Sequence, residues 1–312
     1  MTTLLFGVFA FFTLHNLLWL QRGWVAGKRG EIKFGAAHMA QGGRWVRRFG
    51  KAQIAMHVTV ILTFLVLAAT GLPLRFHGAA WAGQVAGLFG GIESTRFLHR
   101  LAAVGTFGYF AWHILLVLHA WLVKKEKGLF WGWRSMVPRW KDLQDLLANL
   151  RWFLYLGKRP ELDRFTYWEK FDYLAVFWGV AIIGCSGLVL WFPAAAATCL
   201  PGWFLNVCHI VHADEALLAT GFIFIFHFFN THLRPESFPL DPVIFVGRMP
   251  LGRFEEERPA EYRRLVASGQ LESLLEDPPT DGEMAFARGF GFTAMTIGLL
   301  LALGILVGLF VR

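Results

Sequence analysis

Five histidines lie within, or at the rims of, long apolar stretches of the chain. They are His57, His99, His113, His212 and His227. An imidazole without a partner in hydrocarbon is costly, so such residues tend to face the interior of a helix bundle. Neutral imidazole nitrogen is also a frequent metal ligand, and two imidazoles can hold the iron of a haem. These five residues are therefore the candidate cofactor-binding and metal-binding residues.

The spacing of the five histidines places them in two layers. His99 and His113 are fourteen residues apart, so on one helix they lie about 40° from a common line and about 21 Å apart. His212 and His227 are fifteen residues apart and repeat this arrangement at about 60° and 22 Å. The pattern predicts two stacked b haems, because one iron takes two axial ligands from opposite sides. His99 and His212 form the outer layer, while His57 and His113 compete to join His227 in the inner one.

Composition places these residues in a membrane. Hydrophobic residues make up 55% of the 312 positions, with 31 Phe and 14 Trp, which exceeds the usage of a soluble core. Uncharged windows long enough to cross a hydrocarbon layer of about 30 Å lie at 1–20, 52–74, 101–123, 173–192 and 289–311. A sixth, near 209–233, is interrupted by Asp214 and Glu215. We predict an all-α integral membrane protein with about six transmembrane helices.

One membrane domain, residues 1–312, is expected. Its centre is a four-helix haem-binding core at 50–235, flanked by spans at 1–20 and 289–311. Residues 138–157 have apolar positions at helical spacing among several Trp, which predicts an amphipathic helix on the inner interface. The polar residues 236–288 predict a small cytoplasmic flap.

Basic residues predict the orientation, since loops rich in Lys and Arg stay on the cytoplasmic side. Residues 21–51 carry eight Lys/Arg against one acidic residue, 124–172 carry eleven against seven, and 193–213 carry none. Both termini are then periplasmic. The net charge of +8 reflects this topology and contact with anionic lipid, and no nucleic-acid-binding module is present.

Other polar residues are weaker candidates. His15 is expected to serve helix packing, and four further histidines are expected at the interface or at a quinone site: His77, His119, His209 and His232. Six cations are placed to pair with haem propionates or to form an ordinary cationic rim: Arg47, Arg48, Lys51, Arg75, Arg96 and Arg100. Three glycines near the ligands, Gly105, Gly108 and Gly221, could admit a flat macrocycle or serve helix packing. No Cys-x-x-Cys-His exists to attach a c-type haem.

Four tracts carry a resemblance to a known family. They are HVTVILTFLVLAATGLPLRF, FLHRLAAVGTFGYFAWH, KFDYLAVFWGVAIIGCSGLVLWFP and HADEALLATGFIFIFHFFNTH. In order and spacing they resemble the core helices of the dihaem cytochrome b subunits of respiratory formate dehydrogenases, nickel–iron hydrogenases and thiosulfate-reductase-type complexes. The resemblance covers roughly residues 50–123 and 165–235, and the flanking spans are additions to the family pattern.

The resemblance also implies a ligand set. The family takes one histidine from the start of its first core helix, one from the start of its second and two from its fourth. By position this favours His57 with His227 for the inner haem and His99 with His212 for the outer one. The bc-type cytochromes b place two ligands on each of two helices and would use His113 instead of His57. The gap between His212 and His227 is one residue longer than in the family.

The function expected from these features is electron transfer in a bacterial inner membrane. A b-type cytochrome subunit of a quinone-linked oxidoreductase complex would carry electrons between a quinone or quinol pool and a partner redox protein. By resemblance the partner is a periplasmic or cytoplasmic iron–sulfur or multihaem cytochrome subunit. Two alternatives remain: a haem-free membrane anchor, and a proton-coupled transporter that uses the intramembrane histidines.

Overall fold

Long apolar helices make up most of the protein, since a helix satisfies its own backbone polar groups where no water can do so. The computed structural model describes residues 2–35 and 43–310. Among these residues, five helices are long and apolar enough to cross a membrane: Lys51–Arg75, Ile92–Val123, Tyr167–Trp191, Gly202–Leu233 and Asp281–Val307. The chain is therefore a multi-pass membrane protein of predominantly helical fold, as predicted.

Three of the five spans contain π-helical turns, at which the helix is locally wider. The spans comprise α3 (Lys51–Arg75), α5 (Ile92–Leu118) with η1 (His119–Val123), α7 (Tyr167–Gly179) with η2 (Val180–Gly184) and α8 (Cys185–Trp191), α10 (Gly202–Phe222) with η3 (Ile223–His227) and η4 (Phe229–Leu233), and α14 (Asp281–Phe310). Asp214 and Glu215, the charges that interrupt the uncharged window near 209–233, do not break the helix, because α10 continues through both residues. The predicted C-terminal span at 289–311 corresponds to the later part of α14, with residue 311 outside the described residues.

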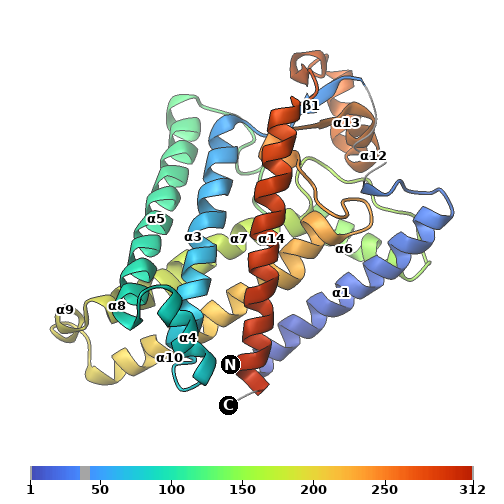
Figure 1. Cartoon of the computed structure of the whole chain (residues 1–312). Coiled ribbons are helices and arrows are strands. Elements are labelled where there is room, and N and C mark those ends of the chain that lie inside the picture. The colour runs from blue at the N-terminus through green and yellow to red at the C-terminus, as the bar shows by residue number, and fades with distance from the viewer. Residues whose placement is uncertain (1, 36–42, 311–312) are drawn as a thin grey trace.

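The predicted first span at 1–20 lies within α1 (Thr2–Lys28), except for residue 1, which is not described. With 27 residues α1 is about 40 Å long, but it is not among the five apolar spans. A sixth span therefore stays a prediction. Figure 1 shows α1 beginning, and α14 ending, at the same end of the helix bundle.

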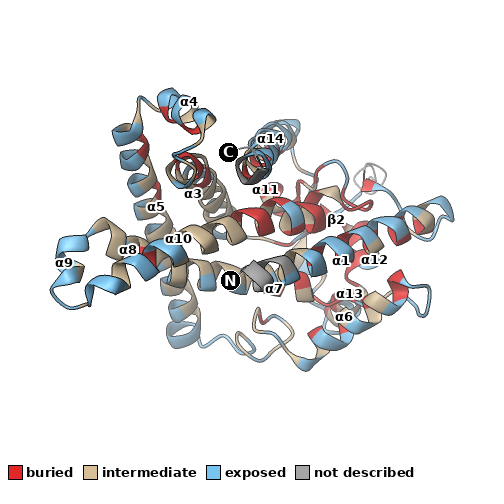
Figure 2. Ribbon diagram, turned by 90° about the horizontal axis from the view of Figure 1, so that it is seen from below, coloured by how far each residue is buried: buried red, intermediate tan, exposed pale blue. Residues whose placement is uncertain are grey.

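The bundle is assembled from two helix pairs. α3 packs along α5, and α10 packs along η2 and α8. α14 contacts α3, and α1 contacts both η3 and the predicted interfacial helix, which is observed as α6 (Trp140–Phe153). The Gly202–Leu233 span is central: half of its most apolar window is buried within the protein, against 6–17% in the other four. Figure 2 shows the same contrast: buried residues gather in the later part of this span, from the end of α10 through η3 and η4, whereas α5 and α14 are mostly exposed or intermediate.

A small α/β unit covers one end of the bundle, at the top right of Figure 1. Its strands β1 (Trp45–Arg47), β2 (Arg248–Pro250) and β3 (Leu275–Glu276) form an antiparallel sheet in the order β2-β1-β3. We call residues 234–280 the flap. It also holds α11 (Val243–Val246), α12 (Leu251–Glu257) and α13 (Pro259–Ala267). These strands were not predicted, because each has only two or three residues and their apolar cluster forms only when β1 joins the flap.

Buried ion pairs hold the segments of the flap together, next to the end of the central span. Arg253 is fully enclosed and binds Asp241 and, at 2.8 Å from Nε, Glu257. Glu257 also accepts from Arg234 at 3.3 Å, directly after the last turn of the central span. Burial alone would raise the pKa of the Glu257 carboxyl, but the charges of Arg253 and Arg234 outweigh it and hold that pKa well below its ordinary value.

Replacing the central cation of this network should loosen the flap. Arg253→Met keeps most of the side-chain volume but removes the positive charge that pairs with the buried carboxylates of Asp241 and Glu257. This loss should lower the free energy of unfolding by about 3–5 kcal/mol. We expect much faster proteolytic cleavage within the flap of the purified protein. The matched control is Arg263→Met, which removes an exposed cation paired with Glu161 and should leave cleavage unchanged. Equal effects of the two variants would contradict the role given to burial.

Acid should release the same contacts only at low pH. The pKa values of Asp241 and Glu257 are lowered in the folded protein, because neighbouring arginines outweigh the effect of burial. Their stabilisation is therefore complete above the unfolded values of about 4 and is lost as the pH falls towards the lower folded values. Hydrogen exchange of flap amides should stay slow at pH 5 and rise below about pH 4. Exchange that already rises between pH 7 and pH 5 would contradict this assignment.

Candidate functional site

Four of the five candidate histidines meet as two pairs, each made by two different helices. We call His99 on α5 and His212 on α10 the outer pair; their ring centres are 6.3 Å apart, with an interplanar angle of 72°. We call His57 on α3 and His227 in η3 the inner pair, with centres 6.4 Å apart and an angle of 42°. The inner pair lies beside the flap, since the His57 ring is also 6.2 Å from that of Phe245.

These separations suit two imidazoles that share one metal ion. A histidine nitrogen lies about 2 Å from the metal it binds, and the centre of the ring lies roughly 1 Å further back. Two rings on opposite sides of one ion therefore have centres about 6 Å apart. Both pairs have this spacing.

Hydrogen bonds in the outer pair fix which nitrogen carries the proton. The Nδ1 of His212 lies 2.9 Å from the carbonyl oxygen of Ile183, which can only accept. The Nδ1 of His99 lies 3.0 Å from the hydroxyl of Thr70, which donates its own proton to the carbonyl of Val66 at 2.6 Å. Both Nδ1 atoms are therefore donors, and the lone pair is on Nε2. Among the described residues neither Nε2 has a hydrogen-bond partner.

The inner pair is held differently. The Nδ1 of His227 lies 2.9 Å from Oδ2 of Asp172 on α7, so a carboxylate is the acceptor. The Nδ1 of His57 is buried and has no hydrogen-bond partner in the part of the chain that the structure describes. A metal-bound histidine usually donates its second ring nitrogen to a carboxylate, carbonyl or hydroxyl group. Three of the four paired rings follow that arrangement.

Two glycines allow the outer rings to lie against neighbouring helices. A Cβ atom at Gly71 would be 3.3 Å from Cε1 of His99, and one at Gly187 would be 3.0 Å from Cε1 of His212. Each glycine directly follows a hydroxyl residue near the same ring: Thr70 before Gly71, and Ser186 before Gly187, with Ser186 Oγ 3.3 Å from Nδ1 of His212. The chain thus uses one arrangement twice.

These supporting residues were not predicted from the sequence. Their signal is a short repeat, with T-G-L-P-L at 70–74 and S-G-L-V-L at 186–190. The glycines considered instead have other surroundings: a Cβ at Gly105 would be 2.9 Å from Thr63 and one at Gly221 2.4 Å from Phe9, while nothing lies within 4 Å of Gly108. Gly105 and Gly221 therefore serve helix contacts.

The remaining histidines do not join either pair. His113 has its Nε2 2.8 Å from the hydroxyl of Tyr173, and the Nε2 of the buried His15 lies 2.8 Å from that of Tyr167. His232 accepts from the backbone N–H of Asp241 at 3.2 Å. Three are exposed: His77, His119 and His209.

The expected propionate partners are mostly paired within the protein. Arg48 is buried against Glu261, so it is not available to a cofactor. Four others contact side chains at the rims: Arg47 with Glu276, Arg75 with Asp214, Arg96 with Glu93, and Arg100 over the ring of Trp191. Lys51 is exposed and has no ion pair among the described residues.

Two ligands per site limit the kind of metal group that fits. No cluster of three or more His, Cys, Asp or Glu suited to a metal ion exists within residues 2–35 and 43–310. Structural zinc takes four protein ligands, which neither pair can supply. Haem brings four nitrogens of its own and needs only two axial ligands. The donor set of each pair therefore fits haem.

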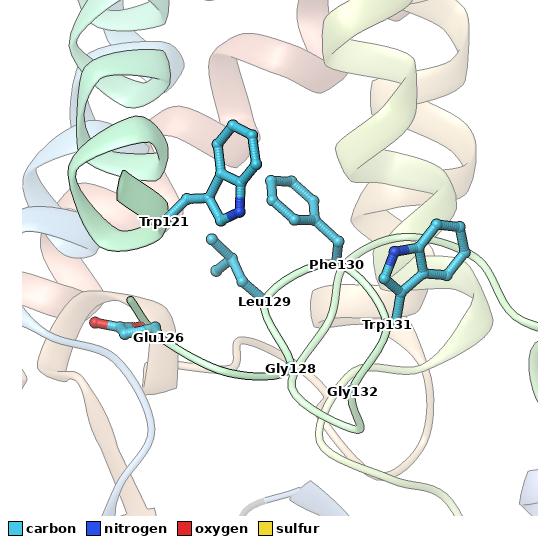
Figure 3. Close-up of a pocket in the computed structure, with 7 residues that line it drawn as sticks. All are labelled: Trp121, Glu126, Gly128, Leu129, Phe130, Trp131 and Gly132. Atoms are coloured by element: carbon cyan, nitrogen blue, oxygen red, sulfur yellow. The ribbon is translucent and has the colours of Figure 1, made fainter. Parts of the chain in front are cut away.

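A separate cavity lies at the flap end of α5 (Figure 3). It has a volume of about 400 Å³ and is lined by Trp121, Glu126, Gly128, Leu129, Phe130, Trp131 and Gly132. Figure 3 shows the Trp121 and Phe130 rings lying close together on one side, with Trp131 apart from them. None of the paired histidines lines this cavity.

Comparisons with known proteins add no identification. No family model matches the chain, and no curated protein matches it. The histidine pairs and their neighbours are therefore the features from which a function is inferred.

Adding a side chain behind an outer ring should destabilise the protein. In Gly187→Val the new side chain would overlap the His212 imidazole, and such overpacking lowers the free energy of unfolding by about 1–3 kcal/mol. The matched control, Gly108→Val, makes the same change in a helix where no atom lies within 4 Å. The thermal unfolding midpoint in detergent should fall clearly more for the first variant. Similar shifts would mean that Gly187 does not support the ring.

Proposed function

We propose that the chain is a membrane-embedded b-type cytochrome subunit that transfers electrons across the bilayer through two haems. The observation that carries the proposal is the pair of two-histidine sites, each with its rings at the spacing of two ligands on one iron. His99 and His212 would hold the outer haem, and His57 and His227 the inner one. When bound between two imidazoles, haem supplies one-electron transfer with no open position for oxygen.

The chain's own residues prepare these sites in three ways. Two different helices supply the two rings of each pair. Thr70, Ile183 and Asp172 accept from the Nδ1–H groups, which leaves Nε2 unprotonated and able to bind iron. The Phe245 ring, 6.2 Å from that of His57, is an apolar neighbour that limits water near the inner pair.

The proposed setting is a bacterial inner membrane with both termini periplasmic. The end that carries the flap also carries the 124–172 segment, with eleven Lys and Arg, whereas the 193–213 segment has none. This asymmetry favours a cytoplasmic flap. We propose α1 as a sixth span, because its 27 residues can cross the hydrocarbon layer.

The electron donors and acceptors follow from this role. No nucleophile elbow or phosphate loop is present in the sequence, and its three cysteines form no cluster motif for an iron–sulfur centre. We propose a quinone or quinol as the exchangeable membrane substrate and an iron–sulfur or multihaem cytochrome subunit as the protein partner. Substrate chemistry would then belong to the partner complex.

Haem counting tests the proposal directly. A pyridine haemochrome assay of the purified chain should give two b haems per polypeptide. His99→Ala and His212→Ala should each remove one low-spin b haem, as should His57→Ala and His227→Ala. An iron with one remaining axial ligand is either released, which lowers the haem count, or retained as a high-spin haem. The reduced-minus-oxidised spectrum reports either change.

His113→Ala is the matched control, since it removes an imidazole of similar depth that contacts Tyr173 rather than another histidine. It should retain two haems. Loss of a haem in this variant, with retention in His57→Ala, would assign the inner ligand to His113. A chain without haem would refute the proposal, and proton-coupled transport or simple anchoring would then have to be tested.

A further inference from the structure

The two histidine pairs differ in the charge of the groups behind them. In the outer pair the Nδ1 atoms face a hydroxyl and a backbone carbonyl, which are neutral. In the inner pair the Nδ1 of His227 faces the carboxylate of Asp172 at 2.9 Å. The two haems, if bound at the two pairs as proposed above, would therefore have different electrostatic surroundings.

Asp172 is placed to act through His227. It lies on α7, one helical turn inside the Tyr167–Trp191 span, and its side chain is only 14% exposed. Its second oxygen, Oδ1, is buried without a hydrogen-bond partner in the part of the chain that the structure describes. The nearest buried cation on this helix, Lys170, is bound to Asp142 at 2.8 Å. His227 is therefore the hydrogen-bond partner of the carboxylate.

A carboxylate inside a membrane span is rare and tends to have a function. Behind a metal-bound histidine it makes the imidazole a stronger electron donor, since the Nδ1–H bond is polarised towards the carboxylate. A buried negative charge also favours the ferric over the ferrous state of a nearby iron, because the ferric centre carries one more positive charge. Both effects act in the same direction. Neutral acceptors produce neither to the same extent.

We propose that Asp172 is a positioning residue that lowers the midpoint potential of the inner haem below that of the outer haem. This inference rests on the proposed function. In a reductive titration each haem takes up one electron from the added reductant, ferric iron becoming ferrous. The outer haem is then reduced first, and the inner haem needs a stronger reductant.

Asp172→Asn is the direct test, because Asn keeps the shape and an accepting oxygen but removes the charge. Spectroelectrochemical titration of the two-haem protein should show one midpoint raised, with at least a tenfold change in the ferric-to-ferrous equilibrium, which is about 59 mV for a one-electron couple. The other midpoint should not move. Repeating the titration in a His99→Ala background, which keeps only the inner haem, assigns the shifted signal.

The matched control is Asp145→Asn, which makes the same substitution at a buried carboxylate whose partner is Lys141 and not a paired histidine. It should leave both midpoints unchanged. A second variant tests the converse: Ser186→Asp adds a carboxylate beside Nδ1 of His212 and should lower the outer midpoint. This second variant keeps the inference testable if Asp172→Asn fails to fold.

The outcomes separate this inference from the proposed function. A protein without haem refutes the proposed function before any potential is measured. A protein with two haems whose midpoints are unaffected by Asp172→Asn, or shift together, overturns the role of Asp172 alone. A midpoint that rises only in the inner haem supports it.

Discussion

The need to satisfy imidazole nitrogens inside an apolar bundle governs the arrangement of this protein. A ring in hydrocarbon can lose its hydrogen-bond partners but cannot replace them with water. In three of the four paired rings, a neighbouring helix supplies an acceptor for Nδ1: Thr70 on α3, Ile183 in η2 and Asp172 on α7. These bonds orient the rings and also determine which helices must lie side by side.

The same constraint explains why small residues lie where the helices meet. Thr70-Gly71 and Ser186-Gly187 each combine a hydroxyl that bonds to its own helix with a position that has no Cβ. The ring of the facing histidine can then approach the backbone of the neighbouring helix. Each helix pair places such a hydroxyl–glycine dipeptide behind one outer ring, so the surroundings of the two outer rings are nearly symmetric. The inner site departs from that symmetry through Asp172 and the unpartnered Nδ1 of His57.

The sequence predicted the spans well because their signal is local. Apolar length identified the five membrane-crossing helices, although the structure extends Ile92–Val123 and Asp281–Phe310 beyond the uncharged windows at their N-terminal ends. Charged residues such as Glu93 and Asp281 can occupy the first turn of a helix outside the hydrocarbon. Local apolarity could not reveal the three short strands, since their pairing joins residues about 200 positions apart.

The candidate site was predictable in part for a related reason. Helical spacing placed the histidines in two layers, but depth alone left His57 and His113 equivalent. What distinguishes them is the neighbour that each side chain meets: His57 lies opposite His227, and His113 contacts Tyr173. Asp172 and Thr70 were not predicted, because a single polar residue in an apolar helix carries no periodic signal. Their roles depend on which helix becomes the neighbour.

One contact in the flap has a consequence for the order of assembly during synthesis. Glu261 binds both Arg48, which precedes the first core helix, and Arg164, which precedes the third. The ribosome must pass residue 261 before this three-part contact can close. By then all four core helices, and every paired histidine, have already emerged in the chain. Closure of this end is therefore a late event, and the bundle has an interval during biogenesis in which its flap side is still open.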